Sequence, residues 1–138
     1  MLKYHLQGIK AGEIEIIIPT LPSVPDGADC STQTGLCYVA IPSGPLGIVK
    51  MINAMPPKLE KYLRTLILTL PKSIQPKVVA YGGVVEFNPG NETVKPYITR
   101  IFQDPTGEMI EMITGVTLHE GKLYLGSLKN KYIGVYEM

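Results

Sequence analysis

The chain has 138 residues, 45% of them hydrophobic and 18% charged, which is the composition of a globular chain and the length of one compact domain. Thirteen basic and twelve acidic residues leave a formal net charge of +1, and no run of like charges marks a surface for a nucleic-acid backbone, so we expect no nucleic-acid partner. The first residues lack the basic segment and apolar stretch of a secretory signal, and we expect the chain to have no address of its own.

Short runs rich in Val, Ile, Tyr, Leu and Thr recur along the chain, each bounded by Gly, Pro, Asn or Asp. The connections between them have lengths and compositions typical of antiparallel hairpins, so a βαβ protein with a nucleotide site is not expected. These runs predict strands at residues 4–8, 13–18, 36–41, 83–88, 94–102, 109–118, 122–128 and 132–137.

The stretch from Pro45 to Ile74 differs because its apolar residues recur at helical spacing. It predicts two short helices, with a break before Pro57 and an end at Pro71. We interpret the pair as a helical hairpin packed on the end of the sheets. A helix that binds a membrane surface or a partner is the alternative, and apolar periodicity alone does not separate the two.

An internal repeat becomes visible once this insertion is set aside. Residues 35–40 and 121–126 both read Gly-x-x-Tyr-aliphatic-small, and each copy lies in a unit of antiparallel strands of the kind that builds β-propeller blades. A further strand near 26–31 completes the first of these units. Propellers need about four to eight blades to close, so the prediction is an all-β, incomplete propeller of about two blades with open strand edges.

The strand count divides this incomplete propeller into three parts. Residues 1–20 would end one blade, 21–105 would form a full blade with a helical insertion at 45–74, and 106–138 would form a last blade that lacks its closing strand.

Four motifs make the chain resemble the C-terminal part of the strictosidine synthase-like family, and the match covers nearly the whole chain. They are residues 3–8 (KYHLQG), 21–27 (LPSVPDG), 102–107 (FQDPTG) and 115–128 (GVTLHEGKLYLGSL). The resemblance implies a six-bladed propeller that shares ancestry with paraoxonase-type and gluconolactonase-type metal hydrolases. It also implies that further blades, and the N-terminal membrane anchor of many members, lie upstream, and that the protein resides in the endomembrane system or plasma membrane, on the lumenal or extracellular side.

Asp26 is the residue that we expect to bind a metal. It follows Pro25 at the head of an inner strand, where the related hydrolases place an acidic calcium ligand. Those hydrolases usually have Asn at the next position, whereas Gly27 offers no side-chain oxygen, and the other ligands would come from blades outside this chain. Pro-Asp-Gly is also an ordinary turn sequence, so a purely structural role of Asp26 stays open.

Thr114 lies at the mouth of the last inner strand, at the position that resembles the one where strictosidine synthases have their catalytic glutamate. A hydroxyl does not act as a general base at neutral pH without an activating group, so condensation of an amine with an aldehyde is not expected. Glu108 and Glu111 are expected to be exposed to solvent. We assign no catalytic residue from the sequence.

The remaining reactive residue types point first to structural roles. His5 and His119 have no second ligand at metal-binding spacing. Cys30 and Cys37 flank a six-residue connection, so a cross-strand disulfide is conceivable, with two buried free thiols the preferred interpretation. Asn91 begins an Asn-Glu-Thr acceptor for N-glycosylation, which matters if the protein enters the secretory pathway.

The resemblance implies a calcium-dependent ester hydrolase of the arylesterase or lactonase type, with small esters or lactones as substrates and Asp26 as one calcium ligand. Membrane association would come from the upstream anchor or from the helical insertion. Gly27 and Thr114 depart from the family's patterns, and they keep two alternatives open: a non-catalytic propeller module for binding or adhesion, and an inactive fragment.

Overall fold

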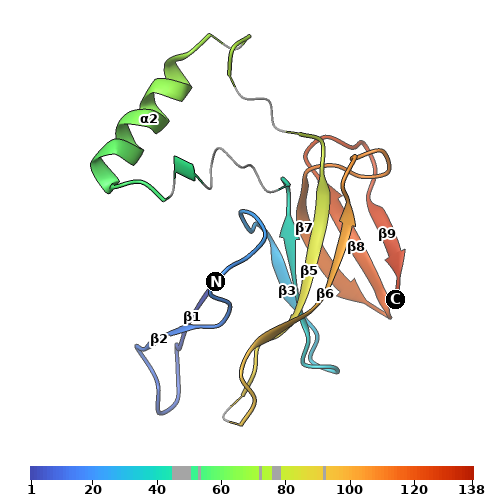
Figure 1. The fold of residues 1–138 in the computed structure, drawn as a ribbon. Helices are drawn as coiled ribbons and strands as arrows, with labels where there is room; N and C mark the ends of the chain where they lie inside the picture. The colour runs from blue at the N-terminus through green and yellow to red at the C-terminus, as the bar shows by residue number, and fades with distance from the viewer. Residues whose placement is uncertain (45–50, 53, 72, 76–78, 92) are drawn as a thin grey trace. The chain divides into compact units, whose positions relative to one another are not determined.

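A computed structural model describes residues 1–44, 51–52, 54–71, 73–75, 79–91 and 93–138. The chain divides into two compact units. The first comprises Met1–Gly44 together with Ala80–Met138 and contains the sheets, and the second comprises Pro45–Val79 and contains a helix (Figure 1).

The first unit contains three antiparallel sheets, with nine strands over the described residues. The first sheet pairs β1 with β2, the second has the order β3-β4-β5-β6, and the third has the order β7-β8-β9, so every sheet is a meander. The strands are β1 (Leu2–Tyr4), β2 (Ile14–Ile16), β3 (Ala28–Cys30), β4 (Cys37–Ile41), β5 (Gly82–Asn88), β6 (Tyr97–Asp104), β7 (Ile113–His119), β8 (Lys122–Ser127) and β9 (Gly134–Glu137).

The predicted fold class is confirmed: the chain is an all-β, open, propeller-like array of antiparallel sheets. Several strand boundaries differ from the predicted ones, and hydrogen bonds explain the two largest differences. The first strand ends at Tyr4, because the amide of Gly12 donates to the carbonyl of His5 at 2.8 Å and closes a turn there. The strand predicted from residue 109 begins at Ile113, because the amides of residues 109 and 110 donate to the Asp104 carboxylate instead of to a neighbouring strand.

The central strands of the second sheet, β4 and β5, are buried on both faces, which is the environment of a propeller blade between two neighbours. Successive residues of a strand point to opposite faces, and all five residues of β4 are buried. One face joins Ile17, Ile18, Cys37, Val39, Ile41, Tyr81, Val85 and Phe87 in a core with the end of the first sheet. The other face joins Tyr38, Ala40 and Val84 with Ile113, Val116, Leu123 and Leu125 of the third sheet.

The second unit contains helix α2 (Pro57–Thr69), as the helical periodicity predicts. Proline is favoured in the first turn of a helix, where its missing N–H is not needed, and Pro71 follows the C-cap residue Leu70. Most of the predicted first helix falls on residues 45–50 and 53, which lie outside the described residues. Packing of the helical hairpin on the sheets stays a prediction.

None of the helices among the described residues combines the length and the apolar character that crossing a membrane requires.

Candidate functional site

The innermost strands of the second and third sheets, β3 and β7, lie side by side. Two hydrogen bonds join them across the sheet boundary. The amide of Gly27 donates to the carbonyl of Thr114 at 2.9 Å, and the amide of Leu118 donates to Oδ2 of Asp29 at 2.9 Å. The inner strands of adjacent blades line the central channel of a propeller, so this boundary is where a channel site would form.

The residues expected at the channel mouth meet at one end of this boundary. Asp26 immediately precedes the Gly27–Thr114 hydrogen bond, and its own amide donates to the carbonyl of Ala40 at 2.9 Å. The Asp26 side chain is exposed, and within the described residues its carboxylate makes no hydrogen bond or ion pair. Asp26 therefore has a carboxylate that is free to meet a ligand at the end of two neighbouring inner strands.

Gly27 has a packing role that the sequence alone did not reveal. A Cβ atom at this position would lie 2.6 Å from the carbonyl oxygen of Thr114, closer than real Cβ atoms approach. Any side chain here would push the two inner strands apart and break the hydrogen bond between them. The absence of a side-chain oxygen at Gly27 is therefore tied to the close approach of the two sheets.

The described residues do not form a metal site by themselves. Among them, no three His, Cys, Asp or Glu residues are grouped so that they could hold a metal ion. Calcium takes about six to eight oxygen ligands, and Asp26 supplies one carboxylate. A calcium ion at this position would need most of its ligands from outside the described residues.

The two glutamates near Thr114 differ from each other. Glu108 is exposed, as expected. Glu111 is not: its side chain is 21% exposed, and its carboxylate forms an ion pair with Lys129 at 3.2 Å. The expectation was wrong for Glu111 because the loop before β7 turns back onto the end of β8, where the carbonyl of Glu111 also accepts a hydrogen bond from Ser127.

The two histidines contact acidic neighbours at separate places. Nε2 of His5 lies 3.1 Å from Oε2 of Glu15 across the first hairpin, with the His5 side chain 16% exposed. That hydrogen bond is the main reason why the pKa of Glu15 is lowered. His119 is exposed and lies 3.8 Å from Glu120 in the β7–β8 turn. Both contacts fit structural roles.

Cys30 and Cys37 form a disulfide, so the preferred interpretation of two free thiols was wrong. The register of β3 and β4 places the two residues directly opposite each other, with their Cα atoms 4.0 Å apart. The tight connection fixes this register, because the amide of Ser31 donates to the carbonyl of Leu36 at 2.8 Å. The spacing of the two cysteines was visible in the sequence, but the register that places them opposite each other was not.

Asn91 is exposed in the connection between β5 and β6. Its Oδ1 accepts hydrogen bonds from the amide and from Oγ1 of Thr93, both at 2.9 Å. The acceptor asparagine of the glycosylation motif therefore lies on the surface, in a turn closed by its own side chain.

A buried ionic cluster in the second sheet was missed by the sequence analysis. The side chain of Glu86 is 2% exposed, and its two oxygens each accept a hydrogen bond of 3.0 Å from Arg100. Oγ1 of Thr99 donates to the same carboxylate at 2.6 Å. Burial acts to raise the pKa of Glu86, but the hydrogen bonds from Arg100 and Thr99 outweigh it and hold that pKa below its ordinary value. The sequence feature that could have indicated this cluster is a single acidic residue, Glu86, in an otherwise apolar strand, with Arg100 in the strand that follows.

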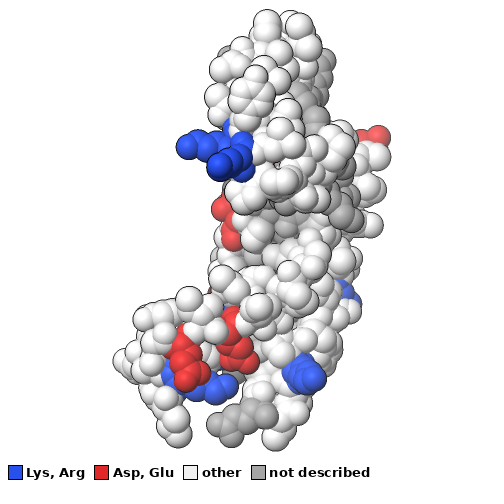
Figure 2. All heavy atoms as spheres, turned by 60° about the vertical axis from the view of Figure 1, so that its left-hand side comes forward, with Lys and Arg blue, Asp and Glu red and all other residues white. Residues whose placement is uncertain are grey.

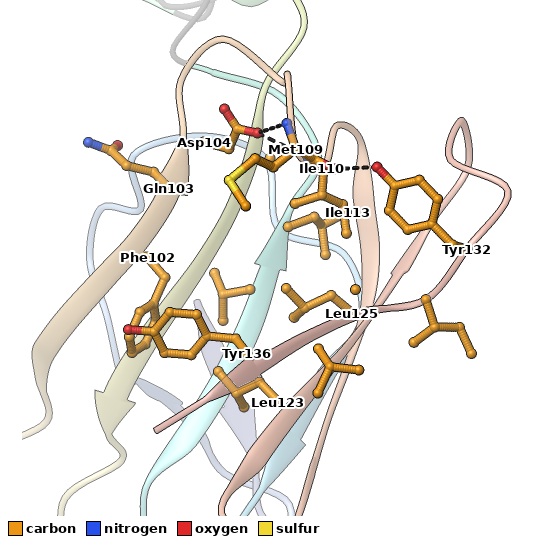
Figure 3. A pocket seen from close by; sticks show the side chains of 15 residues that line it. Phe102, Gln103, Asp104, Met109, Ile110, Ile113, Leu123, Leu125, Tyr132 and Tyr136 are labelled. Carbon is orange, nitrogen blue, oxygen red and sulfur yellow. Dashed lines mark hydrogen bonds between the residues drawn. The ribbon is translucent and has the colours of Figure 1, made fainter.

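Asp104 closes the loop that leads into β7 (Figure 3). Its two carboxylate oxygens accept hydrogen bonds from the amides of Gly107, Met109 and Ile110 at 2.7–2.9 Å. The bond from Ile110 contributes most to lowering the pKa of Asp104, which falls to about 2. The sequence indicated a turn at this motif but not which amides would reach the carboxylate.

A largely apolar cavity of ≈ 670 Å³ opens between the second and third sheets (Figure 3). Phe102 and Tyr136 both line it and contact each other with ring centroids 5.0 Å apart, and the Tyr132 hydroxyl donates to the carbonyl of Met109. Its largely apolar lining has the character of a site for an apolar molecule. Other lining residues include Ile110, Ile113, Leu123, Leu125 and Ile133.

These features define an open, propeller-like all-β fold with one exposed carboxylate, that of Asp26, beside the contact between β3 and β7. No family model matches the chain, and no solved structure matches it. The chain is similar to adipocyte plasma membrane-associated protein from Bos taurus, with 23% identity over 136 residues. The alignment covers 95% of this chain and 31% of the relative, so the chain spans about a third of that protein's length. This distant similarity supports the resemblance to the strictosidine synthase-like family.

Proposed function

We propose that the chain is a section of a strictosidine synthase-like propeller that contributes Asp26 to the channel of a calcium-dependent ester hydrolase of the arylesterase or lactonase type. The supporting observation is the hydrogen bond of 2.9 Å between Gly27 and Thr114, which brings the ends of two inner strands together beside the exposed Asp26 carboxylate. Further calcium ligands would come from blades outside these residues.

The chain's own residues have positioning roles in this proposal. Gly27 permits the close approach of the inner strands, and Asp29 couples them through the amide of Leu118. Thr114 provides a backbone carbonyl at the boundary, and its hydroxyl is a poor general base at neutral pH. Amine-aldehyde condensation is therefore not part of the proposal.

We also propose that the protein lies on the lumenal or extracellular side of a membrane. The disulfide between Cys30 and Cys37 supports this placement, because disulfides persist mainly in oxidising compartments. The exposed acceptor Asn91 is compatible with glycosylation there. The name of the bovine relative connects that protein with the plasma membrane.

Hydrolysis of an aryl ester, measured with and without a calcium chelator, tests the proposed activity in the protein that contains this chain. We expect activity to be lost on chelation and to fall at least ~10-fold in Asp26→Asn, because a carboxylate ligand is removed without a change in size. Glu108→Gln is the matched control, since it neutralises another exposed carboxylate, and it should retain activity. Activity that ignores both the chelator and Asp26→Asn contradicts the proposal.

A non-catalytic binding module is the second candidate, and the apolar cavity between the second and third sheets favours it. A fluorescent apolar probe such as anilinonaphthalene sulfonate should then bind the folded chain. Tyr136→Ser removes one wall of the cavity and should weaken binding. If the probe binds and no ester is hydrolysed, the binding module replaces the hydrolase as the better account.

A further inference from the structure

Charge is divided unequally between the two compact units. Residues 45–79 contain six basic residues and one acidic residue, which gives a net charge of +5. The rest of the chain contains seven basic and eleven acidic residues, which gives a net charge of −4. The nearly neutral total hides this division. The helical unit is therefore strongly basic, and it differs in charge from the sheets that it interrupts.

Helix α2 exposes a line of apolar side chains. Leu59, Tyr62 and Leu66 recur at helical spacing and lie on one face, and they are 47%, 66% and 45% exposed. We call these three residues the α2 stripe. No residue of α2 is buried. An exposed apolar stripe of this kind normally marks a surface that meets another apolar phase.

Two lysines lie on one side of the stripe: by helical spacing Lys58 is next to Tyr62, and Lys61 lies farther round the helix. Lys58 and Lys61 are exposed, and neither forms an ion pair with a described residue. The acidic residue of the unit, Glu60, is engaged by Arg64 at 2.9 Å and so does not neutralise the lysines. Figure 2 shows basic atoms close together on the helical segment amid a mostly uncharged surface. The helix thus combines apolar exposure with uncompensated positive charge.

We propose that α2 binds the surface of a bilayer that contains anionic phospholipids. The α2 stripe would enter the boundary between headgroups and acyl chains, and Lys58 and Lys61 would contact the headgroups. The charge of the unit favours lipid over a protein partner, because protein interfaces are depleted of lysine whereas interfacial helices are rich in it. With 13 residues α2 is too short to span a bilayer, which needs about 20, so it would lie in the surface.

The expected strength of the electrostatic contribution follows from the two lysines. Each basic residue near an anionic membrane surface contributes about 1 kcal/mol, so Lys58→Ala with Lys61→Ala should weaken partitioning roughly 30-fold. Raising the salt concentration should weaken wild-type binding in the same direction. The inference does not rest on the proposed channel site, because none of these residues belongs to it.

Flotation of the 138-residue chain with vesicles tests the proposal. The vesicles are phosphatidylcholine alone or phosphatidylcholine with about 30% phosphatidylserine, a composition that gives a negative surface potential. We expect binding to the anionic vesicles, loss of binding in the double lysine variant, and retention in Lys3→Ala with Lys10→Ala. This control removes the same charge from exposed positions of the first hairpin, Lys3 in β1 and Lys10 in the turn that follows.

A single introduced tryptophan tests whether the stripe itself enters the membrane, because the chain contains no tryptophan. Emission from Leu66→Trp should shift to the blue when anionic vesicles are added. Emission from Leu6→Trp, at a position that is 83% exposed in the first unit, should not shift.

Three results would overturn the proposal. The first is failure of the wild-type chain to bind anionic vesicles. The second is equal loss of binding in the two double lysine variants. The third is Leu66→Trp emission that is already blue-shifted without lipid and unchanged by it, because the stripe would then be covered by protein.

Discussion

Replacing Arg100 with methionine while Glu86 stays in place would leave a carboxylate buried without its cation. The two partners differ in exposure, since the side chain of Glu86 is 2% exposed and that of Arg100 is 58% exposed. Removing one partner of a buried ion pair typically costs ~3–5 kcal/mol, and the low end applies here because Thr99 still donates to Glu86. We expect Arg100→Met to lower the free energy of unfolding by about 3 kcal/mol at pH 7.

The reverse substitution should cost less. Glu86→Gln leaves Arg100 without its anion, but Arg100 reaches water and can be solvated there. We expect a loss of about 1 kcal/mol, the value of a hydrogen bond between side chains. The double variant should be more stable than Arg100→Met alone, because the unpaired buried charge is gone.

The pH dependence gives an independent check. The pKa of Glu86 is lowered in the wild type, so its stabilisation is complete above the ordinary carboxyl pKa and is lost as the pH falls through the lowered value. Without Arg100, burial raises the pKa of Glu86, and stability should increase as the pH is lowered from 7 toward 5. Urea denaturation followed by circular dichroism at both pH values measures this. A larger loss for Glu86→Gln than for Arg100→Met, or no recovery of Arg100→Met at pH 5, refutes the reasoning.

Three further predictions concern the sheets and their loops. Reducing the disulfide between β3 and β4, which closes a loop with a sequence separation of 7, should lower the free energy of unfolding by about 2.5 kcal/mol in chemical denaturation; an unchanged midpoint contradicts this. Gly27→Ala should lower the melting temperature because its Cβ would meet the Thr114 carbonyl, whereas Gly115→Ala, which has open space, should not; equal effects argue against the close approach. Asp104→Ala should lower the free energy of unfolding by ~1–2 kcal/mol at pH 7. Because the pKa of Asp104 is lowered, this difference from the wild type should vanish as the pH falls from 3.8 toward 2. A difference that persists at pH 2 would show that the carboxylate charge is not involved.

Local sequence patterns were sufficient for much of the fold. Alternating apolar residues and turn residues gave the hairpins of all three sheets, and Pro57 gave the start of α2, because these features depend on neighbours within a few residues. The start of β7 could not be obtained in this way. It depends on Asp104 reaching amides of residues 109 and 110, and a propensity for extended structure does not reveal that contact.

The role of the candidate site stays a prediction, and its contacts could not be obtained from the sequence. The motif around Asp26 and the strand containing Thr114 lie more than 80 residues apart, and no local pattern predicts the hydrogen bond from Gly27 to Thr114 that joins them. Asp29 was overlooked because its partner, the amide of Leu118, comes from the other sheet. Glu86 was overlooked for a similar reason: its burial follows from packing on both faces of the sheet, which no single strand reveals.

Amide hydrogen exchange at Leu118 tests most directly whether the second and third sheets are joined along β3 and β7. The Leu118 amide donates to Asp29 of the other sheet, so it should exchange slowly in the wild type and much faster in Asp29→Ala, while amides of β4 and β5 stay protected. Rapid exchange of Leu118 in a wild-type chain whose β4 and β5 amides are protected would contradict the propeller-like arrangement of the two sheets.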